Sequence, residues 1–273
     1  MRIVRARWVV LMLAGFALLA ALSGCATKPS GSTDGDNTSV DIKNRSDDTD
    51  GRRRARIRLE LAVNYYSAQS YKVALDELRL SLQADPNFAD AHGMLALVYM
   101  ALNERGLAEQ SFERALQLSP QDSNINTNYG WFLCQSGREA KSIPYFLAAI
   151  RNPLYATPAL PLQNAGVCSM RIGDVKHAEE YLLRSFQADP KAPVTMYNLG
   201  LLYYKKDDYE RAKFYAQRLI NSVQPNAEAI WLMLRIDRKL GDRASVWALA
   251  TELQNRFPES PEVSKLRSEK FDE

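Results

Sequence analysis

The 273-residue sequence has little of the chemistry from which catalytic and metal sites are built. Its two histidines, His92 and His177, lie far apart in the chain, with no cysteines or carboxylates near them at the spacing of metal ligands. No glycine-rich phosphate loop follows a strand-like run, and Ser23, beside Gly24, offers no nucleophile elbow. We therefore expect a protein that is not an enzyme and that has no metal, no cofactor and no small-molecule substrate.

The sequence also lacks a large excess of positive charge. The formal net charge is +3, and the first 24 residues contribute three uncompensated arginines, Arg2, Arg5 and Arg7. Without this segment the remaining charged side chains are balanced. Because proteins that grip nucleic acid need clustered, uncompensated Lys and Arg, we expect no nucleic-acid partner.

The uncharged hydrophobic run of residues 8–22 is too short to span a bilayer comfortably and has the length of a signal-peptide core. It ends in Leu22-Ser23-Gly24-Cys25, which resembles the lipobox of bacterial lipoproteins. We therefore expect residues 1–24 to be a cleaved signal peptide and Cys25 to carry a covalent lipid. The alternative is an ordinary signal peptide in which Cys25 is incidental.

The residues after Cys25 favour a tethered protein at the outer membrane. Residue 26 is Ala, not the Asp that retains enteric lipoproteins in the inner membrane, so we expect a lipid anchor on the periplasmic side of the outer membrane. Residues 25–52 are mostly small and polar, which predicts a flexible tether. The arginines at 52–58 form either a solvated helix face or a basic patch for anionic head groups or an acidic partner.

Beyond the tether, a period of 34 residues dominates the sequence. It separates Pro86 from Pro120, Ala74 from Ala108, Gly166 from Gly200, and Ala178 from Ala212. Such a shared spacing is typical of stacked helical hairpins. It predicts six hairpins within residues 53–260, at about 55–88, 89–122, 123–158, 159–192, 193–226 and 227–260.

The first five predicted hairpins have small residues where their two helices must approach closely. The eighth position of the first five is Ala62, Ala96, Gly130, Gly166 and Gly200, and the twentieth is Ala74, Ala108, Ser142, Ala178 and Ala212. Larger side chains at helical spacing are expected to fill the core between the helices: Leu61, Tyr65 and Leu78; Leu95, Tyr99 and Phe112; Tyr129, Leu133 and Phe146. This pattern is that of the tetratricopeptide repeat.

The third and sixth repeats depart from the pattern. The third has 36 residues and ends in the proline-containing segment 151–158, which predicts a longer connection, and Pro144 should delay or kink its second helix. The sixth lacks the small residues, as terminal repeats often do. Residues 261–273 form a C-terminal extension that could supply part of a capping helix.

Cys134 and Cys168 fall in adjacent predicted repeats. An oxidising periplasm allows a disulfide between them. Two separate buried thiols are the interpretation that we favour from sequence, because cysteine is commonly buried as a small hydrophobic residue.

The predicted fold class is all-α, a right-handed superhelical solenoid of six tetratricopeptide-type hairpins whose inner surface is lined by the first helix of each. Asparagines recur at the sixth position of repeats three to five and could hold the backbone of an extended peptide, or could simply be solvated. The candidate groove residues are Asn128, Trp131, Asn164, Tyr197, Asn198, Tyr204 and Trp231. A second candidate patch in the first repeat contains Leu59, Val63 and Tyr66.

The lipobox, the short polar tether and six repeats together resemble the type IV pilus pilotin family, often called PilF or PilW. The segments 128–133, 152–155 and 253–258 add to the resemblance, which spans the whole chain. It implies an outer-membrane lipoprotein that binds the pilus secretin, helps it reach the outer membrane and supports its multimerisation. The alternative is a periplasmic lipoprotein scaffold for peptidoglycan hydrolases or for outer-membrane protein assembly.

Overall fold

The computed structural model describes residues 49–222 and 224–271. The chain divides into two units, residues 1–44 and 45–273, and every described helix belongs to the second. The expected signal peptide, the lipid-bearing Cys25 and most of the expected tether lie outside the described residues. None of the helices within the described ranges is long and apolar enough to cross a membrane.

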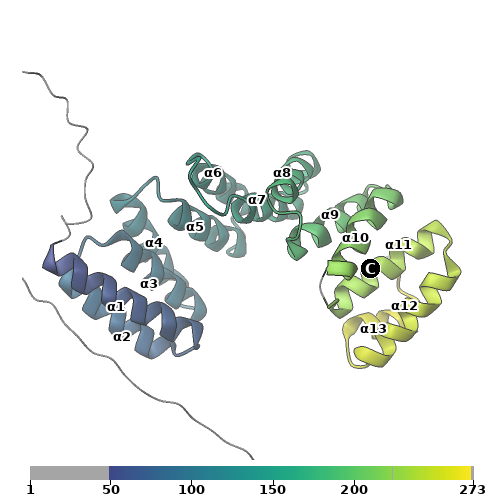
Figure 1. The fold of residues 1–273 in the computed structure, drawn as a ribbon, viewed down its shortest axis with the longest axis horizontal. Helices are drawn as coiled ribbons and strands as arrows, with labels where there is room; N and C mark the ends of the chain where they lie inside the picture. Colours follow the sequence, from purple (N-terminus) through teal and green to yellow (C-terminus); the bar gives the residue numbers. More distant parts are fainter. Residues whose placement is uncertain (1–48, 223, 272–273) are drawn as a thin grey trace, which may run out of the picture. The chain divides into compact units, whose positions relative to one another are not determined.

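In the described residues twelve helices form six hairpins, and a short thirteenth helix follows them (Figure 1). The hairpins are α1 (Asp50–Ser67) with α2 (Tyr71–Ala84), α3 (Ala89–Ala101) with α4 (Arg105–Leu118), α5 (Ser123–Gln135) with α6 (Glu139–Ala149), α7 (Ala159–Arg171) with α8 (Val175–Ala188), α9 (Pro193–Lys205) with α10 (Tyr209–Ser222), and α11 (Ala227–Leu240) with α12 (Arg243–Arg256). Helix α13 (Pro261–Arg267) contacts α11 and α12.

Each hairpin packs only on its neighbours in the chain. A first helix contacts its own second helix and the first helix of the next hairpin, and a second helix also contacts that next first helix. Among the described helices, none contacts one that is more than two places further along. No strand occurs in the described part of the chain. The all-α array of six tetratricopeptide-type hairpins predicted from the sequence is therefore confirmed.

The turn inside every hairpin places one residue in the left-handed backbone region. Three of the six are glycines and three are not: Gln69, Asn103, Gly137, Gly173, Asp207 and Gly241, with φ between 57° and 78°. They recur at the 34-residue period, apart from the 36-residue third repeat. Each residue therefore reverses the chain at the same point of its repeat, a conformation that glycine adopts without steric cost.

The small residues at the eighth position mark the closest approach of the two helices. Ala62 and Ala96 are completely buried. A β-carbon added to Gly130 would lie 2.8 Å from Cε1 of Phe146, on the second helix of the same hairpin. The period therefore identified positions at which the helices leave no room for a larger side chain.

The predicted core of the first hairpin is only partly correct. Leu78 is fully buried, but Leu61 and Tyr65 are 37% and 38% exposed. The equivalent residues of the third hairpin, Tyr129 and Leu133, are buried at 6% and 3%. The physical reason is position in the array, because a preceding hairpin packs on α5, whereas no described helix precedes α1.

Cys134 and Cys168 form a disulfide, which corrects the interpretation of two separate thiols. They lie on α5 and α7, neighbouring first helices that contact each other, and their α-carbons are 6.0 Å apart. Both are buried in a hydrophobic cluster with Phe146, Leu162 and others, so burial and cross-linking coexist. The bond links the third hairpin to the fourth across the longer connection.

Pro144 lies inside α6, which starts five residues before it, so the expected late start of this helix is wrong. Helix α6 has 11 residues, whereas the other second helices have 14. The residues from Ile150 to Pro158 then form the longer connection to α7. Leu154 in this connection is 89% exposed, so the extra residues project away from the core.

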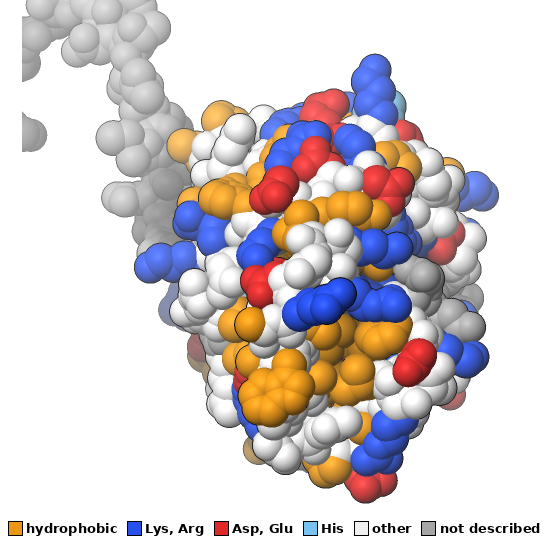
Figure 2. Space-filling model, turned by 90° about the vertical axis from the view of Figure 1, so that its right-hand side faces the viewer, with side chains coloured by type: hydrophobic (Ala, Val, Ile, Leu, Met, Phe, Trp, Pro, Cys, Tyr) orange, Lys and Arg blue, Asp and Glu red, His pale blue; other side chains and the backbone are white. Residues whose placement is uncertain are grey.

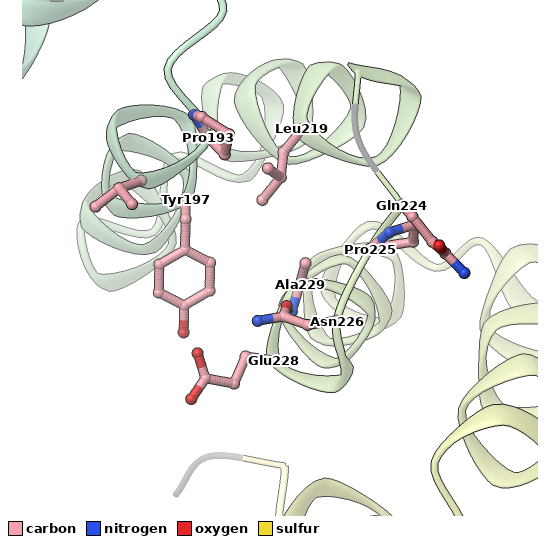
Figure 3. Close-up of a pocket in the computed structure, with 9 residues that line it drawn as sticks. Pro193, Tyr197, Leu219, Gln224, Pro225, Asn226, Glu228 and Ala229 are labelled. Atoms are coloured by element: carbon pink, nitrogen blue, oxygen red, sulfur yellow. Dashed lines mark hydrogen bonds between the residues drawn. The ribbon is translucent and has the colours of Figure 1, made fainter. Parts of the chain in front are cut away.

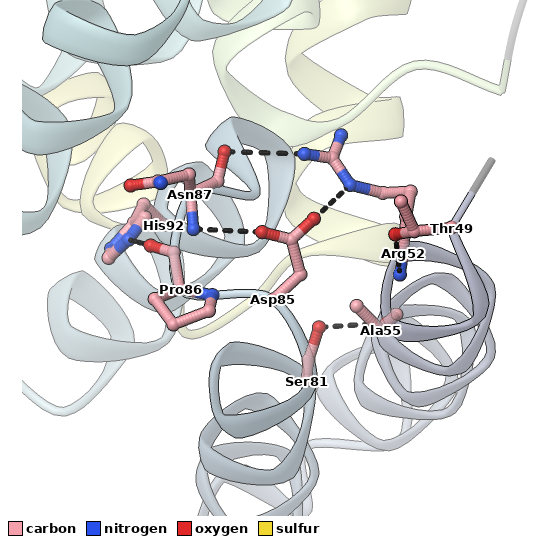
Figure 4. A network of polar contacts seen from close by, with 8 residues as sticks. All are labelled: Thr49, Arg52, Ala55, Ser81, Asp85, Pro86, Asn87 and His92. Carbon is pink, nitrogen blue, oxygen red and sulfur yellow. Dashed lines mark hydrogen bonds and ion pairs between the residues drawn. The ribbon is translucent and has the colours of Figure 1, made fainter. Parts of the chain in front are cut away.

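The arginines at the start of α1 are partly engaged in contacts within the chain (Figure 4). Arg52 forms an ion pair with Asp85, and its guanidinium lies 4.6 Å from the ring centroid of Phe88. Asp85 also accepts a hydrogen bond from the backbone N–H of Asn87 at 2.9 Å. Arg58 forms an ion pair with Glu77 on α2. These contacts attach the first turns of α1 to the rest of the first hairpin and to the loop that follows it.

Candidate partner-binding groove

The first helices of the first three hairpins enclose a hollow of about 330 Å³. Its lining comes from α1, α3 and the start of α5: Leu59, Val63, Asp90, Gly93, Met94, Leu97, Asp122, Asn124, Ile125 and Asn128. A second hollow of about 480 Å³ shares Leu59, Val63 and Asp90 and extends along α1 and the start of α3. We call the two together the N-terminal groove.

The floor of the N-terminal groove is hydrophobic. Leu59 and Val63 are one helical turn apart on α1, so their side chains lie on the same face. Val63 is 42% exposed. One repeat further on, the equivalent positions are Gly93 and Leu97, and a β-carbon on Gly93 would lie 3.4 Å from Ile125. Leu59 and Leu97 are half-buried beside Val63. Apolar side chains that line an open hollow in this way are candidates for contact with another protein.

Carboxylates lie at the edge of the groove: Asp90, Asp122 and Glu60, with Arg56 beside them. Asp122 caps α5, because its Oδ1 accepts a hydrogen bond from the backbone N–H of Ile125 at 2.8 Å. Burial of Asp90 and the nearby charge of Asp122 raise the pKa of the Asp90 carboxyl. The charges of Arg52 and Arg56 lower this pKa, but by less. Two neighbouring carboxylates beside an apolar floor would favour a polypeptide segment that carries both apolar and basic side chains.

Residues from both of the patches predicted from the sequence line the same hollow. Leu59 and Val63 from the first-repeat patch line the same hollow as Asn128 from the predicted asparagine row. Tyr66 does not line it. Its ring lies 5.6 Å from that of Tyr71, and burial followed by the charge of Tyr71 raises the pKa of its hydroxyl.

The three asparagines of the predicted row do not present equivalent amides. Asn128 is half-buried in the N-terminal groove, whereas Asn164 is only 8% exposed. The Nδ2 group of Asn198 donates a 2.7 Å hydrogen bond to the carbonyl of Val194 on its own helix. A peptide-binding ladder of all three, as hypothesised from their spacing, would therefore need rearrangement of Asn164 and Asn198.

The predicted aromatic anchors also differ in their surroundings. Trp131 is half-buried beside the disulfide, with the Arg171 guanidinium 5.8 Å from the centroid of its ring system. Tyr197 lines a separate hollow of about 330 Å³ between α9, the end of α10 and α11, where its hydroxyl points toward Glu228 (Figure 3). Tyr204 is half-buried, and Trp231 is buried at 4% exposure.

A large exposed aromatic side chain also lies at the far end of the array. Figure 2 views the side of α12 and α13 and shows hydrophobic side chains among Lys and Arg side chains. Trp247 on α12 is 73% exposed. Because this residue lies on a second helix, it was not among the candidates sought on first helices.

Sequence reasoning missed several residues of the N-terminal groove, although the period contained a signal for them. Adding 34 to Val63 gives Leu97, and adding 34 to Asp90 gives Asn124, and all four line the groove. Extending the first-repeat patch by one period would have found Gly93 and Leu97. Met94 carries the same signal, because it lies one period before Asn128. Ile125 does not, since the residue one period earlier, Ala91, lines neither hollow.

Both histidines have local partners. His92 Nε2 lies 3.0 Å from the carbonyl of Pro86, and His177 Nδ1 lies 2.7 Å from Oδ2 of Asp174. Within the described residues, no group of three or more His, Cys, Asp or Glu side chains could hold a metal ion.

Comparison of the sequence and the structure with known proteins shows which proteins this chain is similar to. A model of the tetratricopeptide repeat matches residues 89–122 and 194–222. The type IV pilus assembly protein PilF of Pseudomonas aeruginosa (strain PAO1) is 27% identical over 256 residues, which are 93% of this chain and 97% of that protein.

Two solved structures agree with this result. A structure from the functional characterisation of Pseudomonas aeruginosa pilF has a TM-score of 0.75 at 27% identity, covering 80% of this chain and 99% of the other. The crystal structure of PilW, a widely conserved type IV pilus biogenesis factor, has a TM-score of 0.73 at 32% identity, covering 78% of this chain and 97% of the other. The chain therefore belongs to the PilF and PilW family of tetratricopeptide-repeat proteins of type IV pilus biogenesis.

Proposed function

We propose that this protein is a pilotin, a lipid-anchored adaptor that binds the secretin subunit of the type IV pilus. In this proposal, acylated Cys25 holds the protein on the periplasmic side of the outer membrane. The N-terminal groove holds a segment of secretin, so that the subunit is delivered to the outer membrane and multimerises there. The protein acts as an adaptor and turns over no substrate.

The observation that carries the proposal is the apolar floor of the N-terminal groove, with Val63 exposed on it, in a member of a pilus biogenesis family. The groove combines Leu59, Val63 and Leu97 with the carboxylates of Asp90 and Asp122. Apolar contacts would supply affinity, and the carboxylates would select a segment with a basic side chain. The groove also lies in the first three hairpins, the part of the array that follows the expected tether in sequence.

A matched pair of valine variants tests the groove. Val63→Glu places a charge in the floor, whereas Val73→Glu places the same charge on α2, at a residue outside both hollows. The two valines are 42% and 40% exposed, so neither variant should disturb the core. We expect Val63→Glu to lose co-purification with secretin and to reduce secretin multimers in the outer membrane, while Val73→Glu retains both.

Equal behaviour of the two variants would reject the groove as the secretin site. A crosslinker attached at position 63 tests the scaffold alternative. That alternative would be favoured if the crosslinker captures a peptidoglycan hydrolase or an outer-membrane assembly component and no secretin. The anchor is tested separately by Cys25→Ala. This variant should fold normally but leave the outer-membrane fraction, and its retention there would reject the lipid anchor.

A further inference from the structure

A second group of side chains, separate from the N-terminal groove, lies on the first helices of the last two hairpins. It consists of Tyr204 on α9 and Trp231 and Arg235 on α11. The Cζ atom of Arg235 lies 4.8 Å from the ring centroid of Tyr204 and 5.9 Å from that of Trp231. We call these three residues the C-terminal cluster.

The C-terminal cluster contains three buried hydrogen-bond donors that have no acceptor. The hydroxyl of Tyr204, Nε1 of Trp231 and Nε of Arg235 are all inaccessible to solvent, and no residue of the described chain accepts a hydrogen bond from them. The two nitrogens can only donate. Buried polar groups in proteins are nearly always paired, so this concentration of unpaired donors indicates that an acceptor belongs there.

Phe271 covers the Trp231 side of the cluster. The ring of Phe271 stacks on Trp231 at a centroid distance of 5.5 Å, and the Arg238 guanidinium lies 3.8 Å from the Phe271 centroid. Trp231 is consequently only 4% exposed. The hollow of Figure 3, with Tyr197 and Glu228 on its lining, lies one turn earlier on α11.

We propose that Tyr204, Trp231 and Arg235 form a binding site for a carboxylate group, and that the side chain of Phe271 covers this site when it is not in use. A carboxylate offers two oxygens and one negative charge, which match three donors of which only Arg235 is charged. A phosphate group would bring about two negative charges close to Glu228.

The carboxylate has two possible sources, which the test must distinguish. One is a partner polypeptide, through an acidic side chain or its C-terminus. The other is this chain itself, because Asp272 and Glu273 follow Phe271 in the sequence.

Nuclear magnetic resonance of the indole N–H groups tests the site directly. In the full mature chain labelled with ¹⁵N, Trp131, Trp231 and Trp247 each give one indole signal, and Trp231→Phe identifies the relevant one. Titration with sodium acetate should shift the Trp231 signal saturably, whereas sodium chloride at equal ionic strength should not. The signal of Trp247, which is 73% exposed, serves as an internal control.

Variants test whether Arg235 binds the carboxylate and whether Phe271 covers the site. Arg235→Gln should weaken acetate binding at least tenfold, whereas Arg243→Gln, on the exposed start of α12, should leave it unchanged. Phe271→Ala should strengthen acetate binding several-fold, because it uncovers Trp231. Unchanged signals of Trp131 and Trp247 verify that each variant is folded.

Three results would overturn the proposal: no saturable shift of the Trp231 signal, an equal shift with chloride, or full acetate affinity in Arg235→Gln. The double variant Asp272→Asn/Glu273→Gln separates the sources. If the carboxylates of Asp272 or Glu273 occupy the site, this variant should bind acetate more tightly than the unmodified chain, because it has lost the competing side chains. Equal acetate affinity of the two proteins indicates an external source.

Discussion

Gly166 lies so close to Leu182 that a β-carbon at position 166 would be 2.5 Å from Cγ of the leucine and 3.3 Å from the carbonyl oxygen of Ala178. These atoms belong to the two helices of the fourth hairpin, α7 and α8. The contact explains physically why the eighth position of the repeat is small.

We therefore expect Gly166→Ala to destabilise the protein by about 1–3 kcal/mol, because buried Leu182 cannot move away without disturbing the core. Gly106→Ala provides the control, since a β-carbon there meets nothing within 4 Å. At this helical position alanine should be neutral or stabilise by up to about 1 kcal/mol. Urea unfolding of both variants measures the difference, and equal stabilities would contradict the explanation.

The turn of the first hairpin offers a stabilising substitution. Gln69 has φ of 58°, where the turns of the third, fourth and sixth hairpins use glycine. We expect Gln69→Gly to raise the free energy of unfolding by about 1 kcal/mol, because it relieves the steric cost of the left-handed conformation. Gly137→Ala should have the opposite sign, since Gly137 has φ of 73° with open space around it. Thermal unfolding of the two variants checks the signs.

The disulfide between Cys134 and Cys168 should stabilise the folded chain substantially. It closes a loop with a sequence separation of 34 residues, and loop-closure entropy for such a length corresponds to about 3–4 kcal/mol. The double variant Cys134→Ser/Cys168→Ser should lose most of this amount in denaturant unfolding. A reducing agent should destabilise the unmodified protein but not the variant, and equal sensitivity of both would contradict the assignment.

Glu179 makes the junction of the fourth and fifth hairpins sensitive to acid. Burial tends to raise the pKa of its carboxyl, but hydrogen bonds from Lys206 and Tyr203 and the charge of Arg211 lower it below 4.5 overall. The hydroxyl of Tyr203 donates to Oε1 at 2.8 Å. Because the folded pKa is lowered, this contribution to stability is present above pH 4.5 and is lost as the pH falls through the folded pKa.

Glu179→Gln should therefore cost about 1 kcal/mol at pH 7 and much less at pH 3. Unfolding measured at both pH values tests this expectation. Glu180→Gln is the neighbouring control, because Glu180 forms only a 3.5 Å ion pair with Arg184 on its own helix. An identical pH dependence in the two variants would exclude Glu179 as the sensitive group.

The sequence predicted the fold more fully than it predicted the groove. A period of 34 residues with small side chains at its eighth and twentieth positions indicates helix pairs, because only such residues permit approaches like that of Gly130 to Phe146. Burial at the first hairpin could not be derived in this way. Leu61 and Tyr65 match the repeat pattern, and their exposure follows from the absence of a preceding hairpin among the described helices.

The candidate site could be predicted only where the repeat alone determines a side chain's direction. Leu59 and Val63 were found because they occupy groove positions of the first helix. Trp231 occupies a comparable position but is covered by Phe271, which comes from beyond the last repeat. The interpretation of Cys134 and Cys168 as separate thiols was wrong, because periodicity does not determine the distance between two cysteines on adjacent helices.

Because each hairpin touches only its neighbours, local unfolding that starts at either end of the array would spread one hairpin at a time. The disulfide between α5 and α7 would resist this unfolding, whichever end it starts from. A protease acting on the frayed ends would leave a resistant central fragment containing the third and fourth hairpins. The third and fourth hairpins would therefore stay folded while the hairpins at either end unfold and refold.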